Sequence, residues 1–167
     1  NAVQTLINKG LILAGHDISA GGLITTLLEM TFANTEGGID VCLDKFKTDD
    51  LVRVLFAENP GVVVQIADAD KKEFKKILDE VGVGYVKIGT PAEERQIMVT
   101  LGEATYQFGI DYMRDVWYST SYLLDRKQSM NGCAKKRFEN YKMQPVQYKF
   151  HKDFTGKLSS YGLSAER

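Results

Sequence analysis

Apolar residues recur along this chain with two spacings, which predict a mixture of helices and strands. Helical spacing, with apolar residues three or four positions apart, predicts helices up to Gly10 and over residues 23–32, 48–58, 70–81, 110–127 and 133–141. Continuous or alternating apolar runs predict strands over residues 11–14, 39–43, 61–67, 85–88, 96–101 and 105–108. Acidic residues at 49–50 and 68–70 are predicted to cap the helices that follow them, because carboxylates stabilise helix N-termini.

The order of these elements predicts the fold class. Helices and strands alternate at first, and the last two strands then follow each other as a hairpin around Gly102 and Glu103. This order is typical of an α+β fold, in which helices flank a mixed sheet, and not of a doubly wound parallel sheet. We expect one domain over residues 1–128, with Trp117, Tyr118 and Tyr122 in its core. Residues 129–167 are predicted to form a helix and an extended tail.

The last part of the chain differs from the rest. From Gln144 onward, aromatic and aliphatic residues are scattered among Lys, Ser and Gly without a helical period. Such a segment is typical of a chain that lies across another surface, or of a linker to a following domain. The first residue is Asn1 and not Met. We therefore expect the chain to be a fragment of a longer protein.

Composition excludes several classes of function. The 167 residues are 44% hydrophobic, enough for a real core, and 21 Lys+Arg against 22 Asp+Glu leave a net charge of −1. That balance gives no support to nucleic-acid or anionic-membrane binding. Cys42, in a predicted core strand, and Cys133 show neither metal-ligand spacing nor a disulfide pattern, which is typical of a reducing compartment. With no signal peptide and no apolar run of membrane-spanning length, we expect a soluble cytoplasmic protein.

The loop over residues 15–22 carries the candidate chemistry. It is predicted to join a strand to the N-terminus of a helix, where free amides and the helix dipole favour an anion. The hydroxyl of Ser19 can cap the helix or face a phosphate oxygen. Gly21 and Gly22 lack a β-carbon, so a ligand can approach their backbone closely.

Asp17 is an unexpected residue in a phosphate-binding loop. A carboxylate about 5 Å from a phosphate repels it by about 3 kcal/mol at an effective dielectric of about 20. The helix dipole offsets only about 0.3–1 kcal/mol of that repulsion. If the loop holds a phosphate, Asp17 should therefore be a Mg²⁺ ligand. The same residues also serve as ordinary turn and cap residues, and the pattern alone leaves both interpretations open. His16 is interpreted as a packed, hydrogen-bonded residue.

Several motifs, in order, resemble the phosphoribosylformylglycinamidine synthase family. The resemblance covers residues 5–130, and the tail matches mainly in position, as a connector toward a glutaminase domain. The motifs are His16-Asp-Ile-Ser-Ala-Gly-Gly-Leu23, Leu28-Glu-Met-Thr-Phe-Ala33, Ile39-Asp-Val-Cys-Leu43, Leu55-Phe-Ala-Glu-Asn-Pro-Gly-Val-Val-Val-Gln65, Met113-Arg-Asp-Val-Trp117 and Thr120-Ser-Tyr122.

The resemblance implies part of a purine-biosynthesis ligase with an aminoimidazole ribonucleotide synthetase C-terminal-like fold. That family uses ATP and glutamine to convert formylglycinamide ribonucleotide to its amidine. Asp17 then corresponds to a ligand of Mg²⁺ in a structural ATP/ADP site, and Ser19, with Gly21 beside it, to the nucleotide-binding residues. The family usually has a second Asp where this chain has Ala20, so any contact of that carboxylate is missing here.

Two other interpretations remain open at this stage. The chain could be a docking module that only scaffolds a glutaminase, or a stand-alone relative such as an aminoimidazole ribonucleotide synthetase. Under the main interpretation, its partners are the remaining synthetase and glutaminase domains of the same chain. Neither cysteine lies in a tight Gly-x-Cys-x-Gly turn. The chain by itself is therefore expected to have no catalytic activity.

Overall fold

The computed structural model describes residues 1–143 and 149–162. The chain divides into two compact units, Asn1–Ser121 and Tyr122–Arg167, and each is described by itself. The sequence-predicted domain boundary after residue 128 stays a prediction. In the described part of the chain, no helix is both long enough and apolar enough to cross a membrane.

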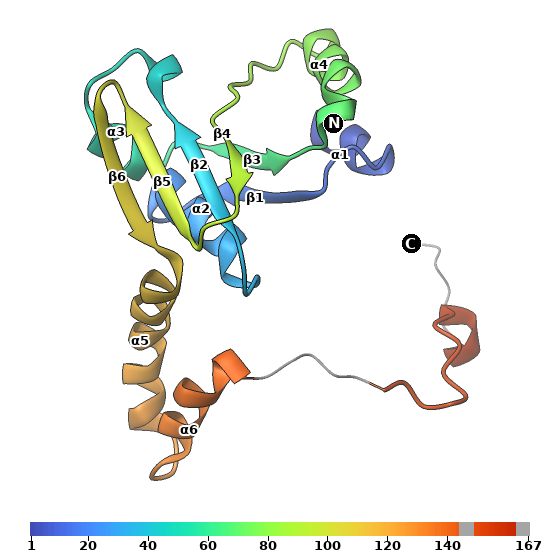
Figure 1. Ribbon diagram of the computed structural model, residues 1–167. Coiled ribbons are helices and arrows are strands. Elements are labelled where there is room, and N and C mark those ends of the chain that lie inside the picture. The colour runs from blue at the N-terminus through green and yellow to red at the C-terminus, as the bar shows by residue number, and fades with distance from the viewer. Residues whose placement is uncertain (144–148, 163–167) are drawn as a thin grey trace. The chain divides into compact units, whose positions relative to one another are not determined.

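The first unit is built on a four-stranded mixed sheet (Figure 1). Strand β2 runs parallel to β5, whereas the β2–β4 and β5–β6 pairs are antiparallel. The predicted mixed sheet is therefore confirmed, as is the hairpin between β5 and β6. The strands, in spatial order, are β4 (Gly89–Ala92), β2 (Gly38–Cys42), β5 (Gln96–Leu101) and β6 (Ala104–Gly109).

The two faces of this sheet differ in chemistry because successive side chains of a strand point to opposite sides. Val41 lies beside Val99 in the parallel register, and both are buried. The neighbouring positions Asp40 and Met98 form a pair on the other face, where polar residues predominate. The sheet therefore has one face for the core and one open, polar face, as is common where antiparallel pairs occur.

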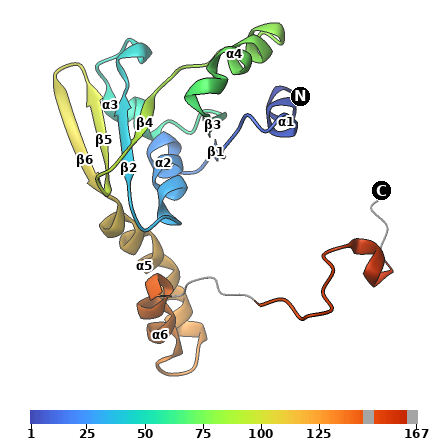
Figure 2. The same cartoon turned by 45° about the vertical axis from the view of Figure 1, so that its right-hand side comes forward.

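Helix α2 (Gly22–Phe32) covers the apolar face and buries Leu23, Ile24 and Leu27 (Figures 1 and 2). A short antiparallel ribbon packs against the same core. It consists of β1 (Ala14–Ile18) and β3 (Gly61–Gln65) and forms a sheet of its own. Short helix α3 (Leu51–Phe56) adds Leu55 to this core.

A second, smaller core lies between α1 (Ala2–Asn8) and α4 (Lys71–Glu80). Its buried residues come from both helices and from the connection after α1; they are Leu6, Leu11, Phe74, Ile77 and Leu78. Short 3₁₀ turns complete the first unit at Asp44–Phe46 and Asp68–Asp70.

Two predicted strands are wrong. The segment 11–14 is mostly a connection, because the amide of Leu11 bonds the carbonyl of Leu6 and its side chain fills the smaller core. The strand begins at Ala14, where pairing with Gln65 starts. Residues 85–88 are also not a strand. The paired residues of β4 begin at Gly89, opposite Val41, and of the segment before it only the carbonyl of Ile88 is seen to bond β2, accepting from the amide of Cys42 at 2.7 Å.

The predicted helix caps are confirmed in one case and, in the other, confirmed in position but without a side-chain hydrogen bond. Asp50 accepts a hydrogen bond from the amide of Arg53 at 2.9 Å, as a helix cap does. Asp70 is the N-cap residue of α4 and ends the 3₁₀ turn Asp68–Asp70, but its side chain makes no cap hydrogen bond. Asp68 instead pairs with Lys71 at 2.6 Å, and this hydrogen bond holds the pKa of the Asp68 carboxyl below its usual value.

Cys42 and three aromatic residues of α5 (Ile110–Gln128), namely Trp117, Tyr118 and Tyr122, were predicted to lie in the core, and this is wrong for all four. Tyr118 and Tyr122 are only half-buried, and Ile110 is the buried residue of α5. Cys42 is exposed because it lies on the open face of the sheet. Trp117 is 46% exposed and packs edge-on against Phe32 of α2. Helical spacing identifies one side of a helix but does not show that another element covers it.

The second unit contains the end of α5 and helix α6 (Cys133–Asn140), so both predicted helices are confirmed. Two contacts join them: Tyr122 stacks on Phe138, and Arg137 forms a 2.6 Å ion pair with Asp125. Beyond 3₁₀ turns at Tyr141–Met143 and Leu158–Tyr161, the described tail residues 149–157 contain neither helix nor strand. The part of the predicted tail at 144–148 and 163–167 lies outside the described residues.

Candidate functional site

The candidate loop consists of Ser19, Ala20 and Gly21, between β1 and α2. It lies at one end of the β1–β3 ribbon, where Ile18 pairs with Gly61. That pairing brings the connection between α3 and β3 next to the loop. The loop is therefore positioned by a strand before it, a helix after it and a second connection beside it.

A tight turn gives the loop its shape. The amide of Gly22 donates to the carbonyl of Ser19 at 3.0 Å, and Gly21 has φ 84° and ψ 0°. These dihedrals fit the third position of a type II turn, which requires positive φ and hence favours glycine. Gly22, at φ 71°, packs its α-carbon against the backbone of Leu55 and Phe56. Both glycines therefore have a folding role in addition to the close ligand approach predicted for them.

Asp17 is an exposed site residue, and its side chain is 73% exposed. The main chain of Asp17, in contrast, is held by a hydrogen bond from α2. The carbonyl of Asp17 accepts a 3.0 Å bond from the hydroxyl of Thr26, a residue that is only 2% exposed. Thr26 thus ties the end of β1 to α2. The carboxylate of Asp17 stays accessible while its backbone is held in place.

His16 is packed and hydrogen-bonded, as predicted. Its Nδ1 lies 2.7 Å from the carbonyl oxygen of Asp17, and its Nε2 lies 3.1 Å from a carboxylate oxygen of Glu29. The other oxygen of Glu29 accepts a 3.1 Å bond from the indole of Trp117. Both imidazole nitrogens thus face oxygen atoms. This network links the end of β1 to Glu29 of α2 and to Trp117 of α5.

Glu58 is a site residue that the sequence did not reveal. One of its carboxylate oxygens accepts a 2.8 Å hydrogen bond from the amide of Gly21, 37 residues away in sequence. The amide predicted to be free for a phosphate is therefore already bonded to a carboxylate. In the sequence, Glu58 stands before Asn59-Pro60-Gly61 and is indistinguishable from an ordinary helix-ending residue. Only the strand register shows the contact.

The residues present are compatible with the Mg²⁺ that the sequence predicts. Mg²⁺ usually keeps several waters and binds one or two carboxylates together with substrate phosphates. The exposed carboxylate of Asp17 fits that requirement. Among residues 1–143 and 149–162, no group of three or more His, Cys, Asp or Glu side chains could hold a metal alone. A cation at Asp17 would therefore need ligands from a bound nucleotide or from another part of the protein.

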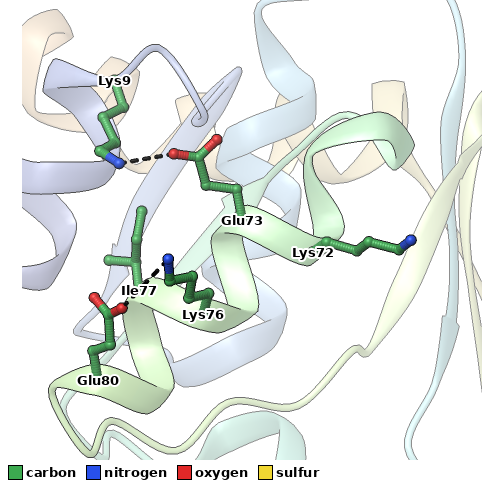
Figure 3. Close-up of a pocket in the computed structure, with 6 residues that line it drawn as sticks. All are labelled: Lys9, Lys72, Glu73, Lys76, Ile77 and Glu80. Carbon is green, nitrogen blue, oxygen red and sulfur yellow. Dashed lines mark hydrogen bonds and ion pairs between the residues drawn. The ribbon is translucent and has the colours of Figure 1, made fainter.

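Two hollows lie elsewhere, and neither is lined by Asp17, Ser19 or Gly21. The larger, about 870 Å³, is on the open face of the sheet, around Asp40, Cys42, Lys87 and Met98. The smaller, about 350 Å³, lies between α1 and α4 (Figure 3).

The lysines of the smaller hollow are largely engaged by neighbouring carboxylates. Lys9 bonds Glu73 at 2.7 Å, and Lys76 lies 3.9 Å from Glu80 (Figure 3). The hydrogen bond with Glu73 raises the pKa of Lys9, and the same bond lowers the pKa of Glu73. This mutual neutralisation makes the hollow a weak candidate for binding an anion.

The family of the chain is shown by a direct match. The model of the AIR synthase related protein C-terminal domain matches residues 1–102. The chain belongs to this family. The family assignment confirms the predicted resemblance, and the predicted fold class agrees with the sheet and helices seen here.

Two curated relatives match more of this AIR synthase related chain. It is 33% identical over 136 residues to human phosphoribosylformylglycinamidine synthase, a match that covers 78% of this chain and 10% of the relative. It is 32% identical over 146 residues to the probable chloroplastic/mitochondrial phosphoribosylformylglycinamidine synthase of Arabidopsis thaliana, covering 86% of this chain and 10% of that protein. The chain thus spans about a tenth of the length of these relatives.

Solved structures show the same fold. Thermotoga maritima PurL complexed with ATP superposes with a TM-score of 0.58 at 17% identity, over 66% of this chain and 20% of PurL. PurL complexed with ADP gives a TM-score of 0.57 at 18% identity, over 66% of this chain and 20% of PurL. At such low identity, the structural likeness establishes the AIR synthase related fold alone.

Proposed function

We propose that this chain is a segment of a phosphoribosylformylglycinamidine synthase. Such an enzyme is an ATP- and glutamine-dependent ligase of purine biosynthesis that converts formylglycinamide ribonucleotide to its amidine. Support comes from the 33% identity with the human synthase, which extends over 136 residues and is not confined to one motif. The partners of the segment are then the remaining synthetase domains and a glutaminase domain.

Within that enzyme, we propose that the loop forms half of a structural site for ATP or ADP with Mg²⁺. The observation that carries this proposal is the exposed carboxylate of Asp17, held beside the entrance of α2 by the buried Thr26. Fold neighbours of this chain have been solved with ATP and with ADP. In this proposal Asp17 binds the cation, the hydroxyl of Ser19 donates to a phosphate oxygen, and Gly21 lets the nucleotide approach.

The charges of the groups explain the separate roles of the site residues. The cation, when bound, neutralises the phosphates and removes the repulsion of about 3 kcal/mol that Asp17 would otherwise exert on them. Asp17 orients the cation, and Thr26 and His16 keep the backbone of Asp17 in place. Ser19 contributes orientation more than affinity, because an exposed neutral hydrogen bond contributes only about 1 kcal/mol.

The test is Mg²⁺-dependent ADP binding by the complete synthase, measured by calorimetry. Asp17→Asn keeps the size of the side chain but removes its charge, so we expect binding in Mg²⁺ to weaken at least about tenfold. Asp79→Asn is the matched control, since Asp79 is an exposed acidic residue on α4, away from the loop. Unchanged affinity in Asp17→Asn would reject Asp17 as a ligand.

One observation favours the docking-module interpretation as a second candidate. The amide of Gly21 already binds Glu58, and Gly22 is required by the contact with Leu55 and Phe56. These features explain the glycines without any ligand. The Asp17→Asn experiment also separates the two candidates, because a scaffold would show no charge-dependent effect of Mg²⁺ at this position.

The 167-residue chain alone is expected to have neither synthase nor glutaminase turnover. Its two cysteines lie on strand β2 and at the start of α6, and neither occupies the tight turn typical of a glutaminase nucleophile. The measurement is chromatographic detection of the amidine after incubation with ATP, formylglycinamide ribonucleotide and either ammonia or glutamine. Amidine formed by the purified chain would contradict this expectation.

A further inference from the structure

Glu58 and the loop of Ser19, Ala20 and Gly21 are joined by a single contact between distant parts of the chain. The carboxylate of Glu58 accepts from the amide of Gly21 at 2.8 Å. Glu58 itself is exposed, so this bond is not a by-product of core packing. It links the connection before β3 to the turn that precedes α2.

The electrostatics of the contact are favourable. Gly21 is the N-cap residue of α2, where the helix dipole is positive and a carboxylate is stabilised. A hydrogen bond from an amide to a charged carboxylate is also stronger than one between neutral groups. Glu58 thus takes the place at this amide that an anionic ligand would otherwise occupy. A phosphate at the same amide would have to displace the carboxylate of Glu58. It would then lie close to this negatively charged group, which would repel it.

Two further hydrogen bonds restrain the turn. One is the bond from Gly22 to the carbonyl of Ser19, and another is the 3.1 Å bond from the hydroxyl of Thr25 to the carbonyl of Gly21. Both of these lie within the turn and its own helix. Glu58 adds a hydrogen bond to the turn from outside this segment, in addition to the contact of Gly22 with the backbone of Leu55 and Phe56.

We propose that Glu58 is a positioning residue for the nucleotide half-site. Its carboxylate holds the turn so that the Ser19 hydroxyl and the Asp17 carboxylate act on one bound nucleotide. The phosphates bind through Ser19 and through the cation at Asp17, and not through the amide of Gly21. This inference rests on the proposed nucleotide-binding function of the loop.

The first experiment tests the contact without any nucleotide. In the 167-residue chain, hydrogen exchange of the Gly21 amide is measured by NMR in Glu58→Ala and Glu58→Gln. We expect exchange to become about tenfold faster in Glu58→Ala, because a hydrogen bond to a charged acceptor is lost. The glutamine side chain retains an oxygen acceptor, so Glu58→Gln is expected to stay within about threefold of the original chain.

The structure supplies an internal control. The amide of Gly102, in the turn between β5 and β6, donates to the carboxylate of Asp44 at 2.8 Å. Its exchange should not change in either Glu58 variant. Equal acceleration at Gly21 and Gly102 would show general loosening and would overturn the specific role of Glu58. Unchanged exchange at Gly21 in Glu58→Ala would overturn it as well.

The second experiment measures Mg²⁺-dependent ADP binding by the complete synthase. Glu58→Ala is expected to weaken binding about five- to tenfold, and Glu58→Gln to restore most of the affinity, because the loss of one restraint is comparable to one hydrogen bond. Glu103→Ala, an exposed residue of the β5–β6 turn, should bind as the original enzyme does.

The outcomes distinguish the two proposals. If Glu58→Ala binds as tightly as the original enzyme while Asp17→Asn does not, the positioning role is wrong and the proposed site stands. If Glu58→Gln is as weak as Glu58→Ala, the charge and not the position matters, and the proposal fails. If the original enzyme shows no binding sensitive to Asp17, the proposed function fails, even where the exchange at Gly21 changes as expected.

Discussion

Replacing Gly22 by alanine is expected to lower the free energy of unfolding of the first unit by about 3 kcal/mol, since backbone strain and overpacking act together. Gly22 has φ 71°, and an added β-carbon would lie 2.6 Å from the carbonyl oxygen of Leu55 and 2.7 Å from the carbonyl carbon of Phe56. Backbone atoms of another segment cannot rotate away as the end of a side chain can. Relief therefore requires α2 and α3 to separate.

Gly82→Ala is the matched control for this change. Gly82 has nearly the same φ, 67°, but no atom lies within 4 Å of the position of an added β-carbon. Gly82→Ala should therefore lower the free energy of unfolding by only about 1 kcal/mol, which is the contribution of backbone strain alone. The measurement is urea unfolding followed by the fluorescence of Trp117, the one tryptophan of the chain, which packs on Phe32 of α2. Equal losses in the two variants would show that the contact with Leu55 and Phe56 is unimportant.

Replacing Ile97 by alanine is expected to destabilise the first unit by about 2–5 kcal/mol, the range found when a large core side chain is truncated. Ile97 is fully buried in β5, between β2 and β6, and faces the core beneath α2. Strands on both sides restrict the movement that could close the cavity. The same urea measurement, read through Trp117, gives the change in free energy.

The neighbouring residue provides the control for Ile97. Met98 lies on the same strand but on the open face of the sheet, beside the larger hollow. Met98→Ala should cost about 1 kcal/mol or less, since substitutions away from packed cores have small effects. A loss in Met98→Ala as large as that in Ile97→Ala would contradict the assignment of the core face.

Much of the fold could be predicted because hydrophobic spacing is local. The periods of residues 23–32, 96–101 and 110–127 identify α2, β5 and α5 to within a few positions. The prediction of secondary structure fails where the role of an apolar run depends on contacts with residues distant in the sequence. Leu11 is apolar because it fills a helical core, and the run at 85–88 precedes a strand that begins only where β2 can pair with it.

The candidate site was predictable only in part. Asp17, Ser19 and Gly21 lie within five residues of the sequence, and the charge argument for a cation needs only their identity. Glu58 and Glu29 could not be found in this way, because their contacts with Gly21 and His16 depend on strand register and helix packing. Those contacts decide which atoms of the loop are free for a ligand.

The sequence by itself determined the fold class, the position of the turn before α2 and the acidic residue near it, because each depends on residues close together in the chain. Asp17 itself lies on β1, two residues before Ser19. Only the tertiary structure decided that β1 and β3 form a separate ribbon, that one sheet face stays open and that a carboxylate occupies the amide of Gly21. Hydrogen bonds between distant segments form only where the packed core brings them within about 3 Å. The spacing of residues along the sequence does not show which distant segments come that close.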